Sequence, residues 1–166
     1  WLEGGATEED AAAVRIRRAR VLARAEAWPE ALRALAGSEL ILHAGDVGGP
    51  EILSRLRELA PVYAVRGNVD TERWVDALPQ TEVVQAGSLY LYMLHDVGSL
   101  DLDPKAAGFA AVIFGHSHTP TSELRDGVLF FNPGSAGPRR FRLPVSVGRL
   151  RIADGQIGGE LLTIES

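Results

Sequence analysis

Short apolar runs that end in polar, glycine-containing turns most restrict what this chain can fold into. Residues 40–42, 62–65 and 110–114 are continuous apolar runs, typical of strands buried on both faces of a sheet. Between the first two runs, apolar residues recur at helical spacing from Pro50 to Leu59. Strand–helix–strand units of this kind predict an α/β fold in which helices pack on a sheet.

Antiparallel hairpins are predicted later in the chain. Residues 82–86 and 89–94 form two strands around Gly87, and two further strand pairs flank Asp-Gly turns. Asp-Gly between alternating segments is a strong hairpin signal. It occurs at Asp126 and again at Asp154, between strands at 123–125, 128–131, 145–152 and 156–164. The order of units predicts mixed sheets, with one domain over residues 14–166 and a polar tail over 1–13.

The N-terminal segment is atypical. Residues 11–27 mix arginine with alanine and valine. Residues 14–17 alternate like a strand, yet the whole segment also fits an arginine/alanine helix, and periodicity does not decide between them. Pro29 then begins a helix that runs to Leu35, with Gly37 as its stop signal.

Composition excludes several classes of protein. The chain has 166 residues, a net charge of -5 and no cysteine, so a basic nucleic-acid face, a disulfide framework and a thiolate metal site are all unsupported. No apolar run approaches the roughly 20 residues of a membrane span. No signal peptide is visible, so a cytoplasmic location is the default expectation.

Polar side chains with metal-ligand chemistry follow four of the predicted strands. In open α/β sheets, ligands bind at the edge where strands end. The residues in these turns supply carboxylate, amide and imidazole groups: Asp46, Asn68, Asp70, His95, His116 and His118. Imidazole and oxygen ligands without thiolates suit Zn, Mn, Fe or Ni.

Each of these residues has an ordinary structural interpretation when taken alone. Asp or Asn after glycine is usually a turn or helix cap, and a single histidine at a strand end is usually structural. The joint pattern decides, because all four histidines, His43 included, fall in these turns. The two imidazoles of Gly-His-Ser-His also form a natural chelate.

The ordered motifs HAGD, GNVD, a lone histidine after a strand, and GHSHTP resemble the calcineurin-like metallophosphoesterases. NPGSAGPRR (132–140) resembles the small bacterial phosphodiesterase branch, which also includes the retromer subunit of the same fold. The resemblance covers about residues 29–164. It implies a four-layer α/β/β/α sandwich with mixed sheets and a two-metal site at its edge.

The resemblance also assigns roles residue by residue. Asp46 matches the carboxylate that bridges both metals, Asn68, His95 and His116 match the remaining ligands of the second metal, and His118 matches a ligand of the first. Asn68 would also face the phosphate. His43 and Asp70 would orient the ligands by hydrogen bonds.

The implied activity is metal-dependent phosphoester hydrolysis by a metal-bound hydroxide, using one or two divalent ions such as Mn, Ni, Zn, Fe or Mg. Many relatives carry a histidine where this chain has Val69, and that histidine can protonate the leaving group. Its absence favours diesters or good leaving groups. Expected partners are a small phosphoester or phosphodiester substrate and a second copy of the chain, without specific nucleic acid or membrane.

The Asp-x-His motif with which the family begins is missing. No histidine precedes His43, and the expected positions fall near residues 21–22 and 23–24, which are Val, Leu, Ala and Arg. The first metal would keep only Asp46 and His118. Two explanations stand: a divergent, impaired enzyme or non-catalytic interaction scaffold, or a reading-frame error across residues 17–27.

Overall fold

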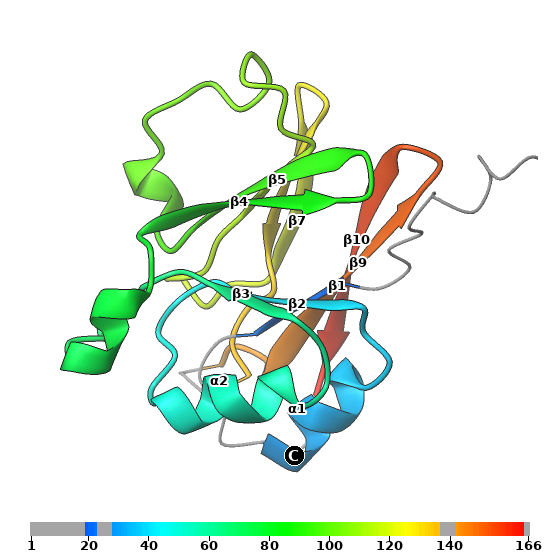
Figure 1. Cartoon of the computed structure of the whole chain (residues 1–166). Helices are drawn as coiled ribbons and strands as arrows, with labels where there is room; N and C mark the ends of the chain where they lie inside the picture. The colour runs from blue at the N-terminus through cyan, green and yellow to red at the C-terminus, as the bar shows by residue number, and fades with distance from the viewer. Residues whose placement is uncertain (1–18, 23–27, 137–141, 165–166) are drawn as a thin grey trace, which may run out of the picture.

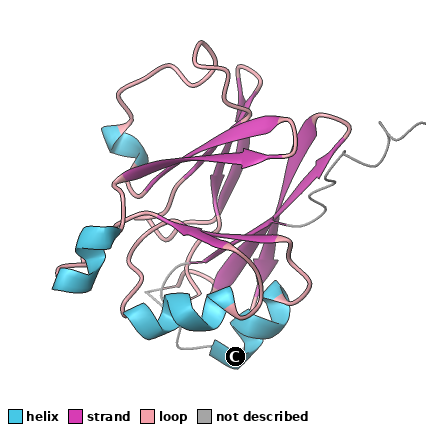
Figure 2. Ribbon diagram, viewed as in Figure 1, coloured by secondary structure: helices cyan, strands magenta, loops and turns pink. Residues whose placement is uncertain are grey.

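Two five-stranded sheets stacked face to face make up the centre of the molecule (Figure 2). The computed structural model describes residues 19–22, 28–136 and 142–164. Strand order is β10-β9-β1-β2-β3 in the first sheet and β4-β5-β6-β8-β7 in the second. Both sheets mix parallel and antiparallel pairs, as the sequence predicts.

The first sheet combines a parallel half with an antiparallel half. Its parallel strands are β1 (Ala19–Leu22), β2 (Leu40–His43) and β3 (Val62–Ala64). The hairpin of β9 (Ser146–Ala153) and β10 (Gln156–Thr163) joins the free edge of β1 in antiparallel fashion.

Helices α1 (Trp28–Leu35) and α2 (Pro50–Arg57) cover the outer face of the first sheet (Figure 1). Pro50 begins α2 at the first helical position, where its missing N–H costs nothing. Leu35, Leu53 and Leu56 are almost fully buried in the cluster that includes Ile41 of β2. The predicted apolar position Leu59 lies beyond the helix end and is 39% exposed.

The second sheet contains β4 (Thr81–Ala86), β5 (Leu89–Leu94), β6 (Ala111–Ile113), β7 (Thr121–Arg125) and β8 (Val128–Asn132). β5, β6 and β8 run parallel, and each edge carries an antiparallel strand. Both Asp-Gly hairpins form as predicted, with Asp126 and Asp154 at positive φ.

Alternate side chains of the strands meet between the two sheets. Leu42, Met93, Ile113 and Phe131 are all fully buried in this central cluster. Burying a side chain of this size stabilises the fold by about 1.5–3 kcal/mol. Phe131 is the largest of these buried side chains.

The outer face of the second sheet is covered by irregular chain. A short 3-10 helix, η3 (Val97–Ser99), is followed by a loop whose Leu100, Leu102 and Phe109 pack on the sheet. The expected fourth layer is therefore built without an α-helix in the part of the chain that is described. Gly98, Pro104 and Gly108 interrupt residues 98–108, which explains this difference.

The N-terminal segment contributes a central strand. Residues Ala19–Leu22 pair with both β2 and β9, so strand rather than helix is correct for this part of residues 11–27. The alternating residues 14–17 and the tail 1–13 lie outside the described residues. The 3-10 helix η2 (Arg73–Ala77) was not predicted. No described helix has the length and apolar character to span a bilayer.

Candidate metal centre

Four strand ends converge at one edge of the sandwich. Asp46 follows β2, Asn68 follows β3, His95 follows β5 directly and His116 follows β6. The two sheets thus contribute two residues each. Short distances between their side chains show that residues up to 49 positions apart in sequence, such as Asp46 and His95, meet in space.

Asp46 is held in an unusual backbone conformation. Its φ is 54°, a left-handed value that few non-glycine residues adopt. The side chain is 5% exposed, and its Oδ1 accepts a hydrogen bond from the Val69 N–H at 3.1 Å. This contact ties the turn after β2 to the turn after β3.

His95 has a defined tautomer. Its Nδ1 lies 2.7 Å from the carbonyl oxygen of Ala44, and a carbonyl can only accept, so Nδ1 carries the proton and donates. In the neutral ring, Nε2 then holds a lone pair. This is the arrangement by which proteins orient a metal-binding imidazole.

The Nε2 atom of His95 faces other acceptors. It lies 2.9 Å from Asn68 Oδ1 and 3.4 Å from Asp46 Oδ1. His116 Nδ1 lies 3.0 Å from the same Asn68 oxygen and 3.3 Å from His95 Nε2. The Nε2 lone pair of His95 repels the two oxygens unless positive charge, from a proton or a metal cation, lies between them. His116 Nδ1 can donate to the Asn68 oxygen in one of its neutral tautomers.

The side chains of this cluster can hold a divalent cation only when the amide of Asn68 is counted among the ligands. Among the described residues, no three His, Cys, Asp or Glu side chains are arranged to hold a metal by themselves. The Asn68 oxygen stands between the two imidazoles at hydrogen-bond spacing, longer than the roughly 2.0–2.2 Å of a metal–ligand bond. Because Asn68 is exposed, its amide can turn without disturbing the core.

Two glycines make room for the cluster. A Cβ on Gly67 would collide with the backbone nitrogen and the carboxylate of Asp46. A Cβ on Gly45 would lie 2.6 Å from His95 Nδ1, and Gly45 has a φ of 92°. Both positions therefore require glycine.

Asp70 connects the turns rather than joining the donor cluster. It is 4% exposed, and its two oxygens accept hydrogen bonds from Gly67 N at 2.9 Å and Gly48 N at 3.3 Å. Arg66 Nε donates to the Asp70 carbonyl at 3.2 Å. The geometry is compatible with the orienting role expected for Asp70.

His43 is a buried neutral base next to the cluster. It is 1% exposed, and its Nδ1 has no hydrogen-bond partner among the described residues. Burial lowers the pKa of His43 from 6.5 to about 4, and the carboxylates of Asp70 and Asp46 offset this only in part. His43 therefore stays uncharged at neutral pH.

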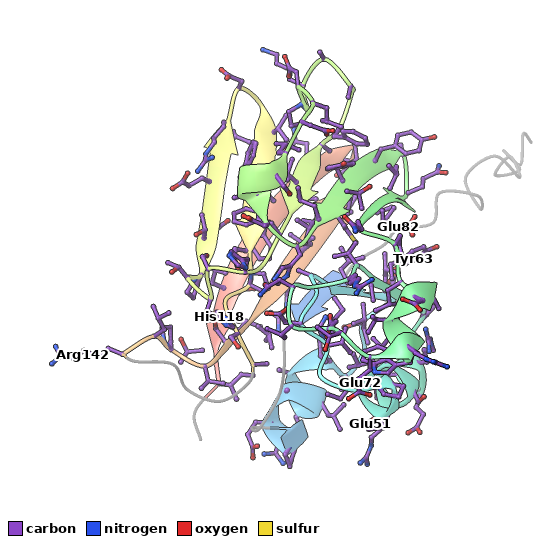
Figure 3. All side chains as sticks on the ribbon, turned by 90° about the vertical axis from the view of Figure 1, so that its left-hand side faces the viewer. Glu51, Tyr63, Glu72, Glu82, His118 and Arg142 are labelled. Atoms are coloured by element: carbon purple, nitrogen blue, oxygen red, sulfur yellow. The ribbon has the colours of Figure 1, made fainter. Side chains whose placement is uncertain are left out.

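His118 lies on the loop that carries His116. It is half-buried, with a left-handed φ of 55°. Figure 3 labels His118 just below the β7–β8 hairpin, and Arg142 projects away from the body of the molecule on a neighbouring loop. β1, the strand expected to carry Asp-x-His, ends at Leu22 beside His43.

Two structural partners of the centre were not identified from the sequence. One is the Ala44 carbonyl, which fixes the His95 tautomer and could not be found from residue type. The other is Asn132, fully buried at the end of β8, whose Nδ2 donates to Gly115 O at 2.8 Å and to Ser117 Oγ at 3.0 Å. Its position at the start of the Asn-Pro-Gly-Ser motif could have indicated this structural role from the sequence.

Comparison with known proteins identifies the family. Residues 23–155 match the model of the calcineurin-like phosphoesterase superfamily domain. A probable metallophosphoesterase of Methanothermobacter thermautotrophicus is 36% identical over 148 residues, covering 84% of each chain. The phosphodiesterase YfcE of Escherichia coli is 33% identical over 110 residues, which cover 60% of this chain and 58% of that protein.

Solved structures show the same fold. A predicted phosphoesterase from Streptococcus pneumoniae superposes with a TM-score of 0.70 at 25% identity, covering 89% of each chain. Vps29 of Entamoeba histolytica gives 0.69 at 23% identity, covering 89% of this chain and 99% of its own. Fold, ordered strand-end residues and sequence similarity together show that this chain belongs to the calcineurin-like phosphoesterase superfamily.

Proposed function

We propose that the protein is a metal-dependent phosphoesterase that favours phosphodiesters. The observation that carries the proposal is the convergence of Asp46, Asn68, His95 and His116, whose side-chain nitrogen and oxygen atoms are linked by contacts of 2.9–3.4 Å. A divalent cation would neutralise this cluster and, when bound, would supply the charge that holds a phosphoester and activates water.

The chain's own residues then have separate tasks. Asp46, His95 and His116 would hold the cation, and the Ala44 carbonyl keeps the His95 lone pair directed at it. Asn68 would ligate through its oxygen and lies far enough into solvent to face the phosphate. Asp70 holds the turn that contains Gly48 and the turn that contains Gly67 at a fixed separation, by accepting a hydrogen bond from each.

The first metal position would be weak. Asp46 and His118 are the candidate ligands there, and β1 ends in Val21 and Leu22, which do not bind metals. The turn after β3 presents Val69, 44% exposed, where a protonating side chain would otherwise be available. Both features favour substrates whose leaving group departs without proton transfer, such as activated diesters.

Hydrolysis of bis-p-nitrophenyl phosphate with added Mn²⁺, Ni²⁺ or Zn²⁺ tests the proposal. We expect metal-dependent release of p-nitrophenolate that is lost in Asp46→Ala and His116→Ala. The control is Asp154→Asn, which removes a carboxylate charge in the exposed β9–β10 turn, away from the site. Absence of turnover with every divalent metal at high protein concentration would refute the proposal.

A non-catalytic interaction scaffold on the same fold is the second candidate. The observation that favours it is the absence of Asp-x-His before His43. Elemental analysis of the purified protein separates the cases. One metal ion per chain would mean that only the second metal site binds a cation, and two ions would mean that both metal sites do. A metal-free protein that takes up no metal on titration would support the scaffold.

A further inference from the structure

A pocket opens directly beside the candidate metal centre. It is a half-open hollow with a volume of about 630 Å³, within the usual range for small-molecule sites. Asn68 and His95 belong to its wall, so a molecule whose phosphate lies on the metal centre would extend one ester group into it. We call this cavity the side pocket.

The side pocket is formed by four segments. The turn after β3 supplies Arg66 and Thr71, the start of β4 supplies Gln80 and Thr81, and the η3 region supplies Asp96, Ser99 and Asp101. Tyr92 and Leu94 of β5 complete the lining and are 8% and 2% exposed. The pocket thus combines a small apolar floor with a rim of hydroxyl, amide and carboxylate groups.

Charge on the rim disfavours an additional anion. Among the residues that line the pocket, the single guanidinium of Arg66 is outnumbered by the carboxylates of Asp70, Asp96 and Asp101. Arg66 is also engaged already, through Nε with the Asp70 carbonyl and through a guanidinium nitrogen 3.8 Å from Asp76 Oδ1. A second phosphate would meet net negative charge.

The same groups suit hydroxyl groups of a ligand. Asp101 is exposed and can accept hydrogen bonds, and Thr81 and Gln80 can both donate and accept them. Asp96 keeps one oxygen on Gly98 N at 2.8 Å, which fixes the carboxylate at the rim. A compact ring or chain with several hydroxyl groups would form hydrogen bonds with the rim and pack its carbon atoms on the apolar floor.

We propose that the side pocket binds an uncharged, hydroxyl-bearing ester group of the substrate, a sugar or polyol, and selects against a second phosphate. This inference rests on the proposed function, because it places the reacting phosphate on the metal centre. It adds the substrate class: phosphodiesters in which the ester group that stays on the phosphate is a neutral polyhydroxylated alcohol.

Isothermal titration calorimetry on the full chain with Mn²⁺ tests the inference without turnover. The four probes are inorganic phosphate, ribose 5-phosphate, n-pentyl phosphate and ribose 1,5-bisphosphate. Ribose 5-phosphate and n-pentyl phosphate share a five-carbon group and differ in hydroxyls. We expect ribose 5-phosphate to bind about tenfold tighter, since each added hydrogen bond contributes roughly two- to tenfold. The bisphosphate should bind no tighter than ribose 5-phosphate.

Two variants connect the preference to the rim. Thr81→Val keeps the shape and β-propensity at an exposed strand position, and Asp101→Asn removes one carboxylate charge. Each variant should lower the ratio of the affinity for ribose 5-phosphate to that for n-pentyl phosphate by about threefold. Asp101→Asn should also bind ribose 1,5-bisphosphate more tightly than the wild type does. Asp154→Asn, outside the pocket, should leave every ratio unchanged.

The outcomes separate the two proposals. Binding of inorganic phosphate with equal affinity for the ribose and pentyl esters would overturn the side-pocket inference and leave the phosphoesterase proposal standing. Much tighter binding of the bisphosphate would overturn it too, in favour of an anion site at Arg66. Absence of Mn²⁺-dependent binding for all four probes would refute the phosphoesterase proposal, and the inference would fall with it.

Discussion

Removing the Asp70 carboxylate should destabilise the protein by a calculable amount. In Asp70→Ala, the buried Gly67 N–H loses its acceptor at 2.9 Å, and the Gly48 N–H loses one at 3.3 Å. An unsatisfied buried donor to a charged group costs about 1.5–3 kcal/mol. Gly48 is exposed and water can replace its partner, so its loss adds only about 0.5 kcal/mol. The expected destabilisation is about 2–3.5 kcal/mol.

Urea denaturation followed by circular dichroism measures this change from the shift of the midpoint at constant slope. Asp70→Asn retains one acceptor oxygen and should lose about half as much, because its NH₂ group then faces an N–H donor. The matched control is Asp76→Ala, a carboxylate 75% exposed and 3.8 Å from Arg66, which should change stability by less than about 0.5 kcal/mol.

The same variant links stability to the metal centre. Because Asp70 joins the turn before Asn68 to the turn after Asp46, its loss should also weaken Mn²⁺ binding by about tenfold or more. Equal unfolding free energies for Asp70→Ala and Asp76→Ala would refute the assignment of Asp70 as the residue that holds these turns together.

Three further predictions concern other parts of the molecule. His43 has a pKa of about 4 in the folded protein against 6.5 in the unfolded chain, so the contribution of its neutral form to folding stability is fully present above pH 6.5 and is lost as pH falls towards 4. In metal-free urea titrations, the wild type should lose up to about 3 kcal/mol of unfolding free energy across this pH window. His43→Leu should show a flatter dependence of stability on pH. Phe131→Ala should cost about 3–5 kcal/mol in the same assay, because the ring is fully buried between the sheets. His95→Ala should abolish high-affinity metal uptake, measured by elemental analysis. The fold should persist by circular dichroism, since the His95 side chain lies at the edge of the core. Retention of full metal content would contradict the proposed ligand set.

Most of the regular structure was predictable because it depends on local patterns. The runs at β2, β5 and β8 are apolar and short, and both Asp-Gly turns adopt the positive φ that their chemistry favours. The segment 11–27 was ambiguous because arginine and alanine suit a helix, whereas pairing with β2 and β9 makes residues 19–22 a strand. Sheet pairing of this kind overrides intrinsic propensity.

The sequence by itself determined which side chains are available at the strand ends, since Asp46, Asn68, His95 and His116 each follow an apolar run. Only the tertiary structure decided that these four meet, that the Ala44 carbonyl fixes the tautomer of His95, and that the side pocket opens beside them. The physical reason is that strand formation follows local periodicity, whereas the distances between donors depend on how the two sheets pack. That packing brings together groups as far apart in sequence as Asp46 and His95, and no local pattern records it.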